Sequence, residues 1–234
     1  MKLRRLNDMN PSIIIAALAS VFALAAITQI QAELSLNTVE KAPPDSLGDS
    51  IKGVLDNKVV QLLDGDRPIF EFWFRTPLAI KSKPASIDKS LAALEQPTLI
   101  GAAKIHEDLR DYRDDDLYGG VHTMRFGLQP EDGNHLGTSE FRYFAVLIPT
   151  KLDQELDGVA TYKRLSKLSS QETSSEHPMI LSLRPVKKSG DSLPSLHEPA
   201  PDHKSIRISL AGMTADGAEA NLVFDLVYEG MGEF

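Results

Sequence analysis

Short apolar runs separated by turn-forming residues dominate the chain from Asn57 onwards. The runs alternate with clusters of Gly, Pro, Asp and Asn, a spacing that is typical of β-sandwiches and barrels. The pattern predicts strands at Lys58–Leu63, Pro68–Arg75, Thr98–Ile105, Gly120–Leu128, Arg142–Ile148, Met179–Arg184, Ser205–Leu210 and Glu219–Tyr228. We therefore expect an all-β protein, mainly an antiparallel β-sandwich of jelly-roll type, with one or two short helices.

Alternation of apolar and polar side chains indicates how each strand is covered. In the segment 219–228, Leu222 and Phe224 share one apolar face, because successive side chains of a strand point to opposite sides. By contrast, Tyr143–Ile148 is apolar on both faces, which is typical of a central strand. Another element must therefore pack over this central strand.

Two segments have the spacing of helices. Ser86–Glu95 predicts about two turns that stop before a proline. A second helix is expected between residues 153 and 170, where it would cover the outer face of the central strand, although Gly158 weakens its first half by up to ~1 kcal/mol relative to alanine. Two long connections, Ser169–Pro178 and Lys187–His203, are rich in Ser, Pro, Glu and His, and whether the second is ordered stays open.

The aromatic strand 68–75 carries the best candidates for ligand binding. Alternation puts three phenylalanines on one face and leaves Trp73, the single tryptophan, beside Glu71 and Arg75 on the other. A tryptophan on a charged face is a platform for a sugar ring or a partner side chain, with the flanking charges as hydrogen-bonding groups. The competing interpretation is a tryptophan covered by a loop or helix, with Arg75 stacked on it.

The first residues are typical of a secretory signal peptide. Lys2, Arg4 and Arg5 precede an apolar run from Ile13 to Ile27, followed by a short polar stretch. This run is shorter than the about 20 apolar residues that a membrane-spanning helix needs, although the large Ile30 leaves an uncleaved signal anchor open. The expected organisation is a signal peptide at 1–32, a flexible linker at 33–56 and a single β-sandwich domain at 57–234.

The amino-acid composition limits which binding partners and which cellular compartment we expect for this protein. The absence of cysteine excludes disulfides, a cysteine nucleophile and the lipid anchor of a bacterial lipoprotein. Without residues 1–32 the chain keeps 22 basic and 32 acidic residues, a net charge of -10, and it has no basic cluster. Nucleic acid and, after cleavage of the leader, membranes are therefore not expected as partners. We expect an exported, periplasmic or extracellular protein, and the missing glycosylation sequon points to a bacterial source.

Oxygen-bearing side chains gather in two loops. The metal-ligand candidates are Asp114, Asp115, Asp116, Asp132, Asn134 and His135. Ca²⁺ binds six to eight oxygens, so convergence of the two loops would create a calcium site. The match to an EF-hand loop is confined to its first positions. A run of aspartates is also typical of a solvated loop, and Pro130–Gly133 of a tight turn.

No established catalytic motif is present in the sequence. It contains no His-x-His, no His-Glu-x-x-His and no Gly-x-Ser-x-Gly, which removes the usual signatures of zinc hydrolases, cupins and α/β-hydrolases. His122 shares the apolar face of its strand with Met124 and Phe126, which favours a hydrogen-bonded core histidine. A catalytic triad built from distant residues stays open, because triads are defined by geometry.

One stretch of the sequence resembles a known group of proteins. Gly119–Thr138, with Arg142–Phe144 following, resembles uncharacterised exported bacterial proteins of the planctomycete type, and the likeness extends loosely to His177–Leu183. This resemblance implies export and no particular activity.

These observations lead to two functional hypotheses. The first is a non-catalytic binding or interaction module for a glycan or a cell-envelope protein, with Trp73, Glu71 and Arg75 in its site. The alternative is a metal-assisted hydrolase that uses Asp114–Asp116, Asp132 and His135. The oligomeric state does not follow from the sequence.

Overall fold

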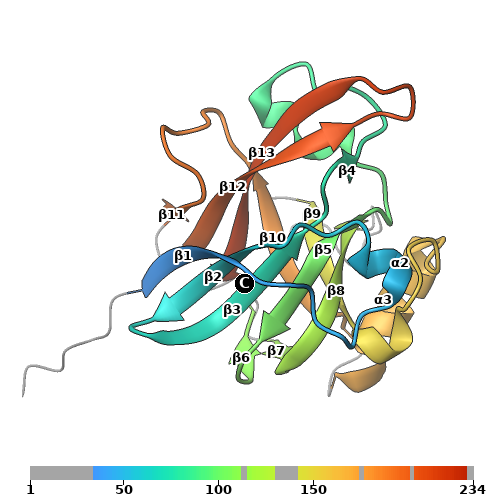
Figure 1. Ribbon diagram of the computed structural model, residues 1–234, viewed down its shortest axis with the longest axis vertical. Coiled ribbons are helices and arrows are strands. Elements are labelled where there is room, and N and C mark those ends of the chain that lie inside the picture. Colours follow the sequence, from blue (N-terminus) through green and yellow to red (C-terminus); the bar gives the residue numbers. More distant parts are fainter. Residues whose placement is uncertain (1–33, 112–114, 130–141, 174–176, 201–202, 231–234) are drawn as a thin grey trace, which may run out of the picture. The chain divides into compact units, whose positions relative to one another are not determined.

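The computed structural model describes residues 34–111, 115–129, 142–173, 177–200 and 203–230 (Figure 1). The strands are β1 (Leu34–Glu40), β2 (Lys58–Asp64), β3 (Arg67–Phe74), β4 (Leu78–Ala79), β5 (Leu99–Ile105), β6 (Leu109–Arg110), β7 (Asp116–Leu117), β8 (Gly120–Leu128), β9 (Tyr143–Pro149), β10 (Ile180–Pro185), β11 (Ser195–Ala200), β12 (His203–Met213) and β13 (Glu219–Glu229). The helices are α2 (Asp49–Lys52) and α3 (Tyr162–Ser169), with 3₁₀ turns η2 (Ile87–Lys89), η3 (Leu91–Ala93), η4 (Thr150–Leu152) and η5 (Ser170–Glu172). The expected mainly β class is confirmed.

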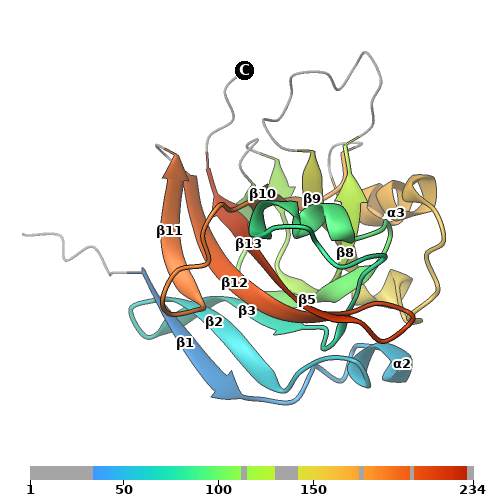
Figure 2. The same cartoon turned by 90° about the horizontal axis from the view of Figure 1, so that it is seen from above.

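One large, strongly curled sheet contains most of the strands. Its order is β1-β2-β3-β5-β8-β9-β10-β13-β12-β11, and every neighbouring pair is antiparallel. The short β4 adds a parallel pairing to β12, while β6 and β7 form a separate hairpin. Figure 2 shows the sheet curving round into a half-barrel, and the strands at its two ends, β1 and β11, are in contact.

The curl replaces the two packed layers that a jelly-roll sandwich would have. A ladder of hydrogen bonds runs unbroken through the strand order, so the described strands do not divide into two facing sheets. Register shifts interrupt the pairing of β2 with β3 and of β5 with β8, at Leu62/Leu63 and Leu99/Gly101. Such bulges bend a strand and increase its twist. At the second one, a β-carbon on Gly101 would lie 2.3 Å from the carbonyl oxygen of Trp73, so only glycine fits.

The concave face of the sheet encloses the main core. Phe70, Phe72 and Phe74 of β3 stack in a row, with ring centroids 5.4 Å and 6.0 Å apart, as their shared face predicts. Leu91 and Leu94, from η3 and the residue after it, pack into the same cluster. The two 3₁₀ turns replace the single helix expected over 86–95, and they lie against β10 and β13 (Figure 2).

Two smaller clusters cover the convex face. Helix α3 packs Leu165 and Leu168 on Val146 and Ile148 of β9, so the prediction of a helix over the central strand is confirmed for its second half. The first half is a loop with a 3₁₀ turn, and α3 begins only after Thr161, whose side chain accepts a hydrogen bond from a backbone N–H in the first turn. The second cluster lies under α2, on the outer side of β2, β3 and β5.

The predicted linker at 33–56 instead contains ordered elements. Strand β1 pairs with β2 along its whole length, and Ile51 of α2 is fully buried on the convex face. The helix approaches the loop after β9 closely: a β-carbon on Gly48 would lie 1.7 Å from the carbonyl oxygen of Gln154. The connection Lys187–His203 likewise contains an edge strand, β11.

The predicted signal peptide at 1–32 lies outside the described residues. Among the helices of the described ranges, none combines the length and the apolar character that a membrane span requires.

Candidate functional site

The ligand-binding candidates Glu71 and Trp73 lie on β3 and Arg75 directly follows it, and the three have different surroundings. Trp73 is 0% exposed and packs with Ile51 and Leu55 from the segment that contains α2. Glu71 is 1% exposed. The indole is therefore a packing residue in this structure, and a ligand would reach it only if the covering segment moved.

Lys41, between β1 and α2, joins Glu71 to Trp73. Its amino group lies 2.6 Å and 2.8 Å from the two carboxylate oxygens of Glu71 and 5.7 Å from the centre of the indole ring. Its backbone carbonyl accepts a 3.0 Å hydrogen bond from the indole N–H. One residue thus satisfies the polar groups of both candidates, and it comes from a segment that sequence reasoning had assigned to a linker.

Glu71 has two further polar partners. The amide of Gln61 donates to its carboxylate at 2.8 Å, and Nε2 of His106 lies 3.1 Å from it. Burial alone would raise the pKa of Glu71, but the hydrogen bonds from Lys41, Gln61 and His106 outweigh it and hold the pKa below its usual value. The carboxylate is consequently ionised and fully engaged within the protein.

Arg75 is in a different environment, just beyond the end of β3. The segment after α2 makes a bridge to its backbone at Leu55, while its side chain lines a hollow of about 420 Å³. The Nε atom is buried and has no hydrogen-bond partner among the described residues. Burial lowers the pKa of Arg75, the carboxylate of Asp157 opposes this effect and the charge of Arg125 adds to it. An arginine nevertheless stays charged, because its pKa starts above 12.

The Arg75 hollow has apolar and polar walls. Its lining residues are Arg75, Pro77, Ala79, Ile80, Lys81, Glu95, Thr98, Met213, Thr214 and Ala215. Lys81 and Glu95 are exposed, so they form its rim. The walls come from β4, from the end of the 3₁₀ segment and from the turn between β12 and β13, which are brought together when β4 pairs with Gly212 and Met213.

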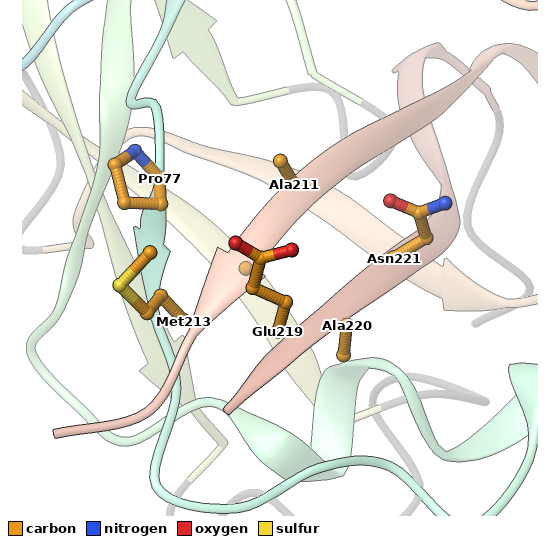
Figure 3. A pocket seen from close by; sticks show the side chains of 7 residues that line it. Pro77, Ala211, Met213, Glu219, Ala220 and Asn221 are labelled. Carbon is orange, nitrogen blue, oxygen red and sulfur yellow. The ribbon is translucent and has the colours of Figure 1, made fainter. Parts of the chain in front are cut away.

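A second hollow, of about 350 Å³, adjoins the first. It is lined by Pro77, Ala211, Gly212, Met213, Glu219, Ala220 and Asn221, so Pro77 and Met213 belong to both. In Figure 3 Pro77 and Met213 stand together at one end, while the side chains of Glu219 and Asn221 rise from the opposite strand. We call the two together the paired hollows. Their volumes are in the lower part of the range of sites for small ligands, about 300–1,000 Å³.

A buried ion pair lies close to this region. Arg125 of β8 is 1% exposed, and its Nε and Nη2 donate to the two carboxylate oxygens of Asp153 at 2.6 Å and 2.9 Å. Its remaining N–H groups donate to the backbone carbonyls of Glu155, Leu156 and Pro97. The pair fixes the loop after β9 on the convex face, where that loop also meets α2 through Ser50. The sequence pattern does not reveal this pair, because 28 residues separate its members.

Four of the six metal-ligand candidates lie outside the described residues, namely Asp114, Asp132, Asn134 and His135. Asp115 and Asp116 belong to the β6–β7 hairpin, where Asp116 lies 3.3 Å from Arg110 and accepts a hydrogen bond from Tyr118. Within the described part of the chain, no three His, Asp or Glu side chains are grouped as a metal site would require. The calcium site and the hydrolase site stay predictions.

The architecture defines a mainly β protein with few short helices and one strongly curled mixed sheet. No protein-family model, no curated protein and no solved structure matches the chain. The resemblance to exported proteins of the planctomycete type therefore stays a prediction.

Proposed function

We propose that this protein is an exported, non-catalytic binding module whose ligand occupies the paired hollows. The observation that carries the proposal is Arg75, a candidate from the sequence that lines a hollow and has a buried donor without a partner among the described residues. Small-ligand sites typically combine apolar walls with a few fixed polar groups. The paired hollows have this composition, since Pro77, Ile80 and Met213 accompany Arg75.

The location of the proposed site differs from a platform built on Trp73. Lys41 engages the polar groups of both Trp73 and Glu71, and neither residue lines the paired hollows, so in this proposal they stabilise the fold and do not contact the ligand. The proposal also includes export of the protein and cleavage of its predicted signal peptide, both of which rest on the signal-peptide pattern. A glycan or a cell-envelope protein remains the proposed kind of partner.

Methyl resonances of methionine provide a direct test. Met213 is 37% exposed and lines both hollows, whereas Met124 and Met179 are buried in the core. We expect a ligand from a panel of glycan fragments, short peptides and small organic acids to shift the Met213 signal in a saturable manner and to leave the two core signals unchanged. If every member of the panel leaves Met213 unshifted, the paired hollows are not the binding site.

A matched variant assigns the signal to the site. Met213→Ala removes the shared wall of the paired hollows while the core stays intact, because this side chain is outside the main cluster. We expect the variant to weaken binding with little change in the unfolding midpoint. Unchanged affinity in Met213→Ala would contradict the proposed location.

A further inference from the structure

Arg75 differs from the other arginines whose side-chain partners the structure describes, because each of those has an acceptor. Nε of Arg164 donates to the backbone carbonyl of Gly158. Arg67, Arg125 and Arg207 each have a carboxylate oxygen within 3.1 Å, from Asp64, Asp153 and Asp225 respectively. In the described ranges no carboxylate lies within ion-pair distance of Arg75, and its buried Nε has no acceptor. The Nε–H of Arg75 is shielded from water without an acceptor, while the side chain as a whole is only partly buried and lines the hollow. Its other N–H groups are therefore the ones available to an anion that enters from outside.

The nearby acidic side chains do not serve as acceptors for Arg75. Asp153 is already held by Arg125, with Thr123 donating a further hydrogen bond to it. Asp157 influences Arg75 through charge and forms no ion pair with it. At the rim, Lys81 and Glu95 carry opposite charges, so the lining of the Arg75 hollow has a net charge of about +1. That charge matches a monoanion.

We propose that the Arg75 hollow selects a carboxylate attached to a small aliphatic body. This inference rests on the proposed function and narrows the ligand of the same site to an aliphatic carboxylate, which sets a neutral glycan aside. The planar guanidinium matches the planar carboxylate in two parallel hydrogen bonds. The apolar wall formed by Pro77, Ile80 and Met213 then takes the aliphatic part, and the second hollow beyond Met213 leaves room for its continuation.

The test compares three probes on the purified protein. Hexanoate carries the carboxylate and the aliphatic body, hexanol carries the body alone, and inorganic phosphate carries an anion without a body. Titrations are followed through the Met213 methyl signal, with Met124 as the silent internal control. We expect hexanoate to bind about tenfold or more tightly than either of the other two, the ratio that a charge-assisted hydrogen bond supplies.

Variants then assign the selectivity to the guanidinium. Arg75→Gln removes the charge and should reduce hexanoate affinity about tenfold while leaving hexanol unaffected. The matched control is Arg67→Gln, which removes an exposed arginine at the start of β3 and should leave both affinities unchanged. Trp73 fluorescence reports whether each variant is folded, and the three-probe comparison on the unaltered protein decides the question even if Arg75→Gln does not fold.

The outcomes separate this inference from the proposed function. Equal binding of hexanoate and hexanol, or equal hexanoate affinity in folded Arg75→Gln, overturns carboxylate selectivity while the paired hollows remain a binding site. Tighter binding of phosphate than of hexanoate also overturns it. A tripeptide with a free C-terminal carboxylate distinguishes the two sources of this chemistry. If it binds more tightly than hexanoate and its amide does not, the carboxylate belongs to a peptide end; otherwise it belongs to a free organic acid.

Discussion

Replacing Asp153 with asparagine removes the counter-ion of a guanidinium that is 1% exposed. The substitution keeps the size of the side chain but turns one of two acceptor oxygens into a donor that faces Arg125. The hydroxyl of Thr123, which donates to Asp153 at 2.6 Å, is affected as well. Breaking a buried ion pair by removing one partner costs about 3–5 kcal/mol, because the remaining charge stays buried without compensation. We expect Asp153→Asn to lower the free energy of unfolding by about that amount.

Equilibrium unfolding in urea measures this loss. Trp73 is the single tryptophan and is fully buried, so its fluorescence reports the exposure of the convex face. The matched control is Glu229→Gln, which breaks the exposed pair between Glu229 and Lys204. Exposed pairs contribute about 0–1 kcal/mol, so this variant should unfold close to the unaltered protein.

Two results would refute the reasoning about the buried pair. A loss below about 1 kcal/mol in Asp153→Asn would mean that water reaches Arg125, as at an exposed site. A double variant, Arg125→Met with Asp153→Leu, separates charge from packing. Because it leaves no unpaired charge, we expect it to recover most of the stability lost in the single variant. Failure to recover would show that the five donors of Arg125, and not the uncompensated charge, hold the loop.

Three further predictions concern the core, the charged cluster on the convex face and the cap of α3. Phe72→Ala removes the middle ring of the buried stack and should cost about 3–5 kcal/mol in urea unfolding; a loss under 1 kcal/mol would show that the stack collapses without a cavity. Because the pKa of Glu71 is lowered on folding, its contribution to stability is complete above the unfolded pKa of about 4.3 and is lost as pH falls through the folded value. Glu71→Gln should therefore reduce the slope of stability against pH below about 4.3, and an unchanged acid profile would contradict the shift. Thr161→Ala removes the N-cap and should cost about 1 kcal/mol, measured by the same urea assay, whereas Thr161→Ser should cost little.

Strand positions in the middle of the sheet follow closely from the sequence. The predicted segment Gly120–Leu128 has the bounds of β8, and the predicted Glu219–Tyr228 is one residue shorter than β13. These strands have a strong apolar pattern because at least one face is buried against the core. The two end strands of the order have weak patterns: β1 has no fully buried side chain, and β11 contains Pro199. An end strand has a neighbouring strand on one side only, so less of its surface is buried and fewer apolar residues mark it in the sequence.

The alternation of apolar and polar residues does not determine how strongly a sheet curls. A period of two assigns each side chain to one of two faces, but it leaves open whether an apolar face meets a second sheet or curves round on itself. Here the bulges at Leu62/Leu63 and at Gly101 bend β2 and β5. The 3₁₀ turn η3 packs into the core inside the curve. Those features depend on contacts between distant segments, which is why the sandwich was expected and a half-barrel is observed.

In the candidate site too, the local sequence pattern predicts which residues alternate along the strand, whereas contacts with distant segments decide their environments. Alternation assigns Glu71, Trp73 and Arg75 to one face, and their local pattern treats them alike. Their environments differ because Lys41 lies 30 residues away from Glu71 in the sequence and covers the first two. Arg75 lies just beyond the end of β3, where Leu55 bridges to its backbone and its side chain lines a hollow shared with the β12–β13 turn. Among these three residues, Arg75 is the one whose buried donor has no acceptor in the described part of the chain, and this is why we place the proposed ligand site at Arg75 and not at the tryptophan.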